Sequence, residues 1–235
     1  MILIEKHIIN KNDKNWKQID HLCFLSKNLY NSALYLIKQE FTSSGKVIRY
    51  KQLDKLMQSN ENYSLLPNNT SQQILIILDR NIKSYFSLLK KWKSNKKSLL
   101  GCPQFPKYKD KVKGRNLLVF TKNQFARKEN SLISLPRKTK LDFFKSSKEN
   151  IQQVRIIPSS GCYKLEVIFK VEEKVNNNAT KYSSIDLGLN NLMTVFLEGK
   201  SFIVNGRPLK SINQYYNKEN AKIKSELKRR HNKNS

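Results

Sequence analysis

Cysteine is scarce in this sequence of 235 residues, and its three copies lie far apart. Cys23, Cys102 and Cys162 form no CxxC pair, which argues against a zinc ribbon within these residues and against a disulfide scaffold. This use of cysteine fits a reducing, cytoplasmic environment. No run of 18 or more apolar residues and no signal-peptide pattern follows Met1. We therefore expect no membrane role.

Acidic residues are the second shortage. The chain has 18 Asp or Glu against 45 Lys or Arg, a formal net charge of +27, where a magnitude of about 2 to 8 is typical of small soluble domains. A polyanion is the natural partner of such a chain, and nucleic acid is favoured over an anionic membrane surface. Hydrophobic residues make up 38% of the sequence, which is enough for a packed core.

The first hundred residues have mainly helical periodicity. Residues 1–9 alternate like a strand, residues 15–41 and 50–59 predict helices, and Thr70 or Ser71 is the expected N-cap of a further long helix. Apolar residues recur at helical spacing along this last helix: Ile74, Ile77, Leu78, Ile82, Tyr85, Leu89 and Trp92. We interpret this stripe as ordinary core.

From Leu100 onward the helical period is lost and short strands are expected. Four segments indicate strands: 116–121, 131–136, 152–158 and 162–173. The polar residues 175–181 read as a linker, three more strands are expected within 183–206, and a basic helix follows from Ser211.

The positive charge is concentrated in residues 80–148, which hold 20 Lys or Arg and three acidic residues, a local charge of +17. Within them, the loop sequence FPKYKDKVKGR interleaves aromatic and basic side chains, a pairing suited to phosphate neutralisation and stacking. The candidate contact residues are Lys107, Tyr108, Lys109, Lys111, Lys113 and Arg115. The alternative is a solvated lysine-rich loop.

A single carboxylate, Asp186, interrupts the apolar run SSIDLGLNNL. Such a residue is either an exposed or hydrogen-bonded strand end or a ligand for Mg²⁺, which prefers carboxylate oxygens. Paired ions can align the nucleophile and the leaving oxygen in phosphodiester cleavage, but one carboxylate cannot hold such a pair.

The combination SIDLGLNNLMTV and FIVNGRPLKSINQYYNKENAKIKSEL resembles the start of the RuvC-like nuclease domain of the transposon-encoded TnpB family, also called OrfB. Upstream, LYNSALYLIKQ, LPNNTSQQILIILDRNIKSYFSLLKKW and GCPQFPKYKDK resemble the helical and basic regions of that family. The resemblance extends over essentially the whole chain.

The resemblance implies an α+β fold with four parts. Residues 1–10 would be the first strand of an oligonucleotide-binding-like wedge β-barrel, 11–100 a helical recognition domain, 101–174 the basic remainder of the barrel, and 182–235 the first part of an RNase H-like nuclease domain.

The family consists of RNA-guided DNA endonucleases, so the resemblance implies a prokaryotic protein that is nucleoid-associated when bound to DNA. Its implied partners are a transposon-derived guide RNA and double-stranded target DNA. Asp186 would be the first catalytic acid and a Mg²⁺ ligand, and Arg207 and Lys210 join the candidate nucleic-acid contacts.

The sequence also departs from the family. The second acid, usually Glu, the third, usually Asp, and a four-cysteine zinc ribbon are far downstream in the family and are not among these residues. Glu219 and Glu226 lie on the basic helix, where pairing with Lys or Arg is the simpler interpretation.

We therefore expect a truncated protein that is inactive as a nuclease by itself. An incomplete nuclease sheet should expose Leu192, Val195, Phe202 or their neighbours and favour a second polypeptide that completes it. The main alternative is a non-cleaving RNA- or DNA-binding regulator of the transposon or its host genes, such as an RNA chaperone for the transposon transcript. A ribosome-like basic protein with a chance motif is the third.

Overall fold

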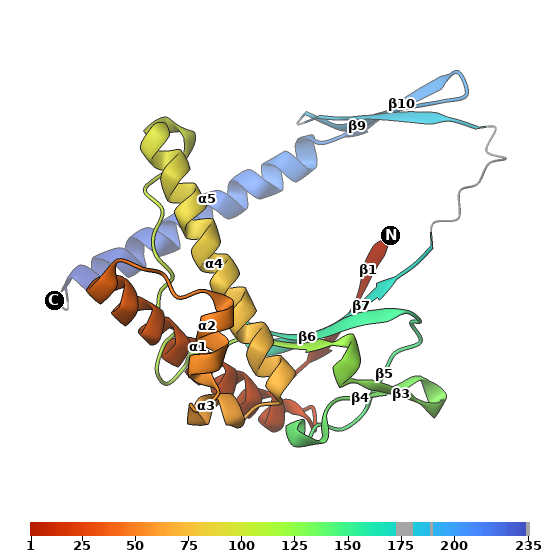
Figure 1. Cartoon of the computed structure of the whole chain (residues 1–235). Helices are drawn as coiled ribbons and strands as arrows, with labels where there is room; N and C mark the ends of the chain where they lie inside the picture. Colours follow the sequence, from red (N-terminus) through yellow and green to blue (C-terminus); the bar gives the residue numbers. More distant parts are fainter. Residues whose placement is uncertain (173–180, 189, 234–235) are drawn as a thin grey trace. The chain divides into compact units, whose positions relative to one another are not determined.

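The computed structural model describes residues 1–172, 181–188 and 190–233 (Figure 1). By their contacts the residues form two units, Met1–Glu173 and Lys174–Ser235. The predicted linker 175–181 lies outside the described residues except for Lys181. No helix among the described ranges is long and apolar enough to cross a membrane.

Four helices build the first part of unit 1: α1 (Trp16–Ser44), α2 (Tyr50–Met57), α3 (Glu61–Ser64) and α4 (Asn68–Ser94). The predicted helices are confirmed, and α1 continues to Ser44. It ends where Gly45 takes a φ of 69° and its N–H donates to the Phe41 carbonyl at 3.0 Å.

The predicted N-cap of α4 is wrong. The helix begins at Asn68 after Pro67. The hydroxyls of Thr70 and Ser71 are used elsewhere: Ser71 donates to the Tyr63 carbonyl at 2.9 Å, and Thr70 accepts from the Gln124 amide at 2.9 Å. Both residues are buried, so tertiary contacts decided their role.

The main sheet of unit 1 is antiparallel, with strand order β1-β7-β6-β2. Its strands are β1 (Ile2–Ile9), β2 (Leu118–Thr121), β6 (Ile151–Ser159) and β7 (Cys162–Lys170). The N-terminal strand thus pairs with a strand more than 150 residues away, with Ile4 opposite Ile168. The expected β-barrel is not seen among the described strands, because β1 and β2 remain at the two edges and the sheet is open.

A small second sheet contains β3 (Ala126–Lys128), β4 (Leu132–Ser134) and β5 (Phe144–Lys145), in the order β3-β4-β5. Short 3₁₀ turns occur at Lys96–Ser98, Lys122–Gln124, Glu129–Ser131 and Arg137–Thr139.

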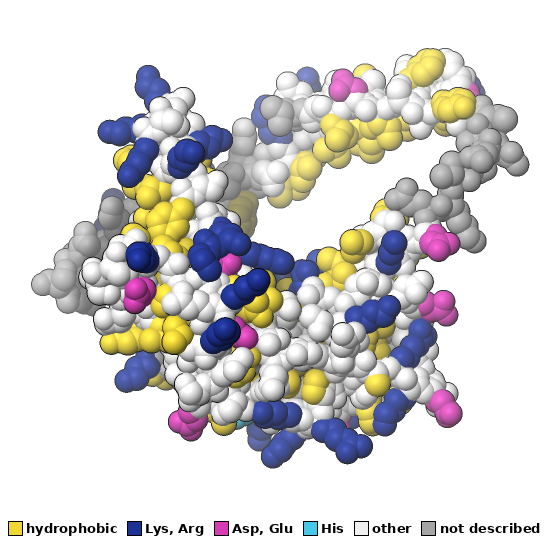
Figure 2. Space-filling model, in the orientation of Figure 1, with side chains coloured by type: hydrophobic (Ala, Val, Ile, Leu, Met, Phe, Trp, Pro, Cys, Tyr) yellow, Lys and Arg dark blue, Asp and Glu magenta, His cyan; other side chains and the backbone are white. Residues whose placement is uncertain are grey.

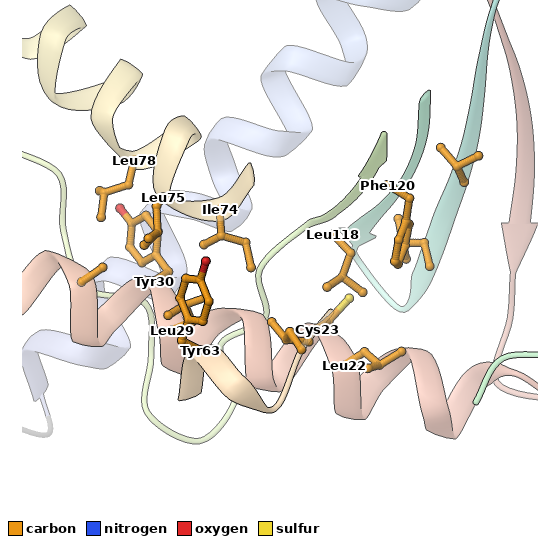
Figure 3. Close-up of a cluster of buried hydrophobic side chains, with 14 of the residues drawn as sticks. Leu22, Cys23, Leu29, Tyr30, Tyr63, Ile74, Leu75, Leu78, Leu118 and Phe120 are labelled. Atoms are coloured by element: carbon orange, nitrogen blue, oxygen red, sulfur yellow. The ribbon is translucent and has the colours of Figure 1, made fainter. Parts of the chain in front are cut away.

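The core of unit 1 lies between the four helices α1 to α4 and the main sheet. Figure 3 shows buried side chains from several of these elements in one cluster, among them Cys23 of α1, Leu78 of α4 and Phe120 of β2. Of the apolar stripe predicted on α4, Ile74, Leu78 and Ile82 are buried in the core, whereas Ile77 is half-buried. Tyr85, Leu89 and Trp92 are half-buried because α4 continues beyond the sheet and the other helices.

Unit 2 has a three-stranded antiparallel sheet followed by one long helix. The strands are β8 (Ser183–Leu187), β9 (Asn191–Leu197) and β10 (Lys200–Asn205), in the order β10-β9-β8, and the helix is α5 (Arg207–Lys233). The expected start of this helix at Ser211 is four residues late. Asn205 explains the difference, because its side-chain oxygen accepts from the Arg207 N–H at 3.0 Å.

The predicted exposure of the unit 2 sheet is confirmed for Leu192 and Phe202, which are 39% and 52% exposed. It is wrong for Val195, which is 7% exposed because it lies on the central strand between Ile185 and Phe202.

Candidate nucleic-acid interface

The basic segment 107–115 lies along α1, held by side chains one helical turn apart. The Asn31 side chain both donates to the Lys109 carbonyl and accepts from the Lys109 N–H, each at 2.9 Å. The Lys27 ammonium donates to the Lys111 carbonyl at 2.7 Å. Because these bonds engage the backbone of the segment, its side chains remain available for other partners.

Lys27, which holds the backbone of the segment, is unusual because a lysine side chain is rarely buried and this one is only 2% exposed. Its nitrogen lies 3.8 Å from the centre of the Phe24 ring, in addition to its bond with the Lys111 carbonyl. Burial lowers the pKa of this ammonium. A buried cation with a carbonyl and a ring as partners fixes the segment in one register on α1.

The end of the segment is a tight turn built on Asp110. Its carboxylate accepts from the Lys113 N–H at 2.6 Å and the Val112 N–H at 2.9 Å, and these bonds lower its pKa. A Cβ on Gly114 would lie 2.3 Å from the Asp110 carbonyl oxygen. Glycine is therefore required for the chain to close this turn.

Four of the six predicted contact residues in the segment are exposed: Lys107, Tyr108, Lys111 and Lys113. Tyr108 is 46% exposed, and the Lys38 ammonium of α1 lies 4.2 Å from its ring centre. Lys109 is half-buried over the Tyr30 ring, and burial lowers its pKa. A ridge of three cations with an aromatic ring between them can neutralise phosphates and stack on a base or sugar.

Arg115 is instead engaged inside the protein. Its guanidinium donates to both carboxylate oxygens of Asp20, at 2.8 and 2.7 Å, and to two backbone carbonyls of the turn. The Tyr163 hydroxyl also donates to Asp20, at 2.5 Å. The hydrogen bond from Arg115 lowers the pKa of the Asp20 carboxyl. This bidentate pair links the turn to α1 and β7.

The remaining predicted residues lie in unit 2. Asp186 is exposed on β8, opposite Thr194 of β9. Arg207 is exposed at the start of α5, and the Lys210 ammonium donates to the Asn190 side chain at 3.0 Å.

Two other acidic side chains of unit 2 pair with lysines, whereas Glu226 has no ion pair among the described residues, so its predicted pairing is not seen. Glu198 pairs with Lys181 at 3.1 Å, and Glu219 pairs with Lys222 at 2.8 Å, so the predicted pairing of Glu219 is confirmed. The part of the chain that the structure describes has no group of three or more His, Cys, Asp or Glu suited to a metal ion.

Sequence reasoning missed the residues of α1 that position the interface. Lys27 and Asn31 occur four residues apart on a largely apolar face of α1, on which Ser26 is also polar and buried. Two polar residues at that spacing on a buried face indicate a common partner. Only the tertiary structure shows that this partner is the backbone of a segment about 80 residues downstream.

Comparison with known proteins gives one family match. Residues 160–235 match the family OrfB_IS605, described as a probable transposase. No match is found among the curated proteins.

Among solved structures, a chain of a Cas12f1–sgRNA–target DNA complex is similar with a TM-score of 0.38 and 11% sequence identity, covering 94% of this chain and 62% of that one. A chain of a CRISPR–Cas12f ternary complex has a TM-score of 0.34 and 14% identity, covering 89% of this chain and 51% of that one. This chain thus spans less than two thirds of either.

Proposed function

We propose that this chain, whose residues 160–235 match the OrfB_IS605 probable transposase family, binds nucleic acid as a TnpB/OrfB-type protein. The observation that carries the proposal is the basic segment on α1, whose backbone is fixed by Lys27 and Asn31 while Lys107, Lys111 and Lys113 are exposed. Its proposed ligands are a transposon-derived guide RNA and double-stranded target DNA.

The domain assignment is part of the same proposal. Residues 1–10 and 101–174 form an oligonucleotide-binding-like wedge around a helical recognition domain at 11–100. The pairing of β1 with β7 across the helical region supports such an insertion. Residues 182–235 form the first part of an RNase H-like domain, and the antiparallel order β10-β9-β8 followed by α5 supports this. A prokaryotic cytoplasmic location follows from the proposed function.

Asp186 is proposed as the first Mg²⁺ ligand of a nuclease site. One carboxylate does not fit a pair of metal ions by itself, and the described residues contain no group of three or more His, Cys, Asp or Glu suited to a metal ion. Further carboxylates would therefore have to come from beyond the described residues, for example from a second polypeptide that completes the sheet. We expect residues 1–235 alone to bind without cleaving, which also suits the alternative role of a non-cleaving regulator.

The binding proposal is tested by titrating the purified chain into labelled RNA and labelled duplex DNA at several salt concentrations. Reversing the charge of Lys107, Lys111 and Lys113 to Glu should lower the affinity at least tenfold. The slope of log K against log salt concentration should become less steep by about 2 to 3, because about three phosphate contacts are lost. Unchanged affinity would refute the assignment of the interface to this segment.

The cleavage part has a separate test. The chain is incubated with Mg²⁺, a guide RNA transcribed from sequence beside its gene, and duplex DNA bearing the complementary target. Binding without cleavage is expected. Guide-dependent double-strand cutting that Asp186→Asn abolishes would show that these 235 residues already hold a complete nuclease site.

A further inference from the structure

A cavity of about 620 Å³ lies between α2 and α4 and is lined by four basic residues. None of them belongs to the segment 107–115. Arg49 and Lys51 come from the start of α2, and Arg80 and Lys83 come from the middle of α4. Asp79 is the one acidic residue of the lining, which leaves a local charge of +3. Figure 2 shows Lys and Arg side chains gathered over these two helices.

Asp79 holds two of the four cations in place. Its side chain is 8% exposed, and its two oxygens lie 2.9 and 3.1 Å from the guanidinium nitrogens of Arg49 and 3.3 Å from the Lys83 ammonium. One buried carboxylate thus fixes two cations but neutralises one. Arg80 and Lys51 are exposed, and no ion pair of either is found among the described residues. The cavity keeps an excess of positive charge that invites an anion.

The backbone adds to this potential. Arg49 is the N-cap of α2 and supplies no capping side chain, and the first turn of α2 contains no acidic residue. The first N–H groups of a helix have no acceptor within it, and the dipole makes this end positive. Arg49 is paired with Asp79, but Lys51 adds a further positive charge in the first turn. A positive helix end with such a cation beside it favours the binding of an anion.

A second cavity, of about 320 Å³, extends the surface. It lies between α4 and the strands β2 and β6, and Arg80 lines both cavities. Arg155 of β6 lines the second one, and its guanidinium is oriented by the Gln153 side chain at 2.7 Å. The two cavities on either side of Arg80 form a basic path from the start of α2 across α4 to the sheet.

We infer that this path, the α2–α4 site, binds the phosphodiester backbone of a nucleic-acid strand. Lys51, Arg80 and Arg155 are the phosphate contacts, and Arg49 and Lys83 shape the cavity through Asp79. The inference rests on the proposed function, but it assigns a second contact surface that lies outside segment 107–115. It also predicts no base selectivity, because phosphates are the groups contacted.

The test compares two double variants of the full chain. Lys51→Glu/Arg80→Glu changes the path, whereas Lys55→Glu/Lys145→Glu changes two other exposed cations of unit 1 that line neither cavity. Arg49 is left intact, because its loss would leave the buried Asp79 with one partner fewer. Both variants change the net charge equally, and circular dichroism melting shows whether each is folded.

Binding of a labelled RNA strand and of a DNA strand of the same sequence is then measured against salt. We expect the path variant to bind both strands at least tenfold more weakly, with a salt slope reduced by about 1.4 to 1.8, and the control to change less than threefold. Equal losses for the two variants, or a loss confined to RNA or to DNA, would overturn the assignment to phosphates.

The triple variant of Lys107, Lys111 and Lys113 separates the two proposals. If that variant loses affinity and the path variant does not, the α2–α4 site is wrong and the proposed function stands. If the unaltered chain binds neither strand, the proposed function fails and the inference fails with it. If only the path variant loses affinity, the α2–α4 site is the main interface.

Discussion

The two units differ in how they use apolar side chains. Unit 1 has a continuous buried core between its four helices and the main sheet. In the described part of unit 2, Val195 is the one buried hydrophobic side chain. By strand register, seven apolar residues share one face of the unit 2 sheet: Ile185, Leu187, Met193, Val195, Leu197, Phe202 and Val204. Figure 2 shows hydrophobic side chains gathered along one side of β9 and β10.

The same contrast holds for carboxylates. Asp20 of unit 1 accepts from Arg115 and Tyr163, whereas Asp186 of unit 2 is exposed and has no ion pair among the described residues. The contacts within unit 1 are therefore sufficient to fix the position of segment 107–115. Unit 2 carries Asp186, the proposed Mg²⁺ ligand, but it has little of the packing that would fix the position of this carboxylate.

Truncating one phenylalanine in each unit tests this contrast most strongly. Phe120→Ala removes a side chain with no exposed surface and should destabilise unit 1 by about 3–5 kcal/mol. Phe202→Ala, at a side chain 52% exposed, should cost about 0.5 kcal/mol or less. Native-state hydrogen exchange of β6–β7 and β9–β10 measures each sheet separately. Comparable costs would mean that the unit 2 sheet is covered in solution.

Replacing one lysine in each unit gives a smaller difference. Lys27→Met keeps the buried stem but leaves the Lys111 carbonyl without its donor, and the loss of a buried charge offsets part of this cost. We expect a loss of about 1–2 kcal/mol and faster trypsin cleavage after Lys109, Lys111 or Lys113. Lys210→Met, whose ammonium bonds to Asn190 at an exposed site, should leave cleavage of this segment unchanged. Equal protection in both variants would show that Lys27 does not hold the segment.

Asp20 predicts how the stability of unit 1 depends on pH. Its pKa is held below the usual value of 3.8 by the hydrogen bond from Arg115. A carboxyl with a lowered folded-state pKa stabilises the protein above its unfolded-state value, and this contribution is lost as the pH falls through the folded-state value. Melting temperature should therefore fall less steeply below about pH 4 in Asp20→Asn than in the unaltered chain.

The control for this pH profile is Asp142→Asn, because that carboxylate pairs with Lys14 at a site where both side chains are exposed. Its profile should follow that of the unaltered chain. If both variants reduce the fall of melting temperature at acid pH equally, the effect is due to net charge rather than to the Asp20–Arg115 pair.

Asp186→Asn should have the smallest effect. Since the carboxylate is exposed and has no ion-pair partner among the described residues, we expect a change in stability of about 0.5 kcal/mol or less and unchanged RNA affinity. Equilibrium unfolding and the labelled-RNA titration check both. An increase in stability on adding Mg²⁺ that the variant lacks would show that Asp186 already binds the ion productively.

Several features could be predicted from local sequence. The helical period of α1, the strand alternation around Asp186 and the basic loop at 105–115 all have signals within a few residues of themselves. The extent of the α4 core had no such signal, because Leu89 and Ile74 have the same spacing pattern and differ only in what lies opposite them. Thr70 and Ser71 look like caps by type, yet their hydroxyls bond to residues of other elements.

The sequence by itself determined the charge, the order of the longer helices and strands, and the family resemblance, because composition and periodicity are properties of neighbouring residues. The short elements α3, β3 and β5 had no such signal. The tertiary structure alone decided which cations are free. Lys27 is buried and Arg115 is half-buried and paired with Asp20, while Lys107 and Lys111 are exposed. It also brought Arg49 and Arg80 to one cavity. The physical reason is that a charge buried among distant elements must find a partner there, and sequence spacing does not record those elements.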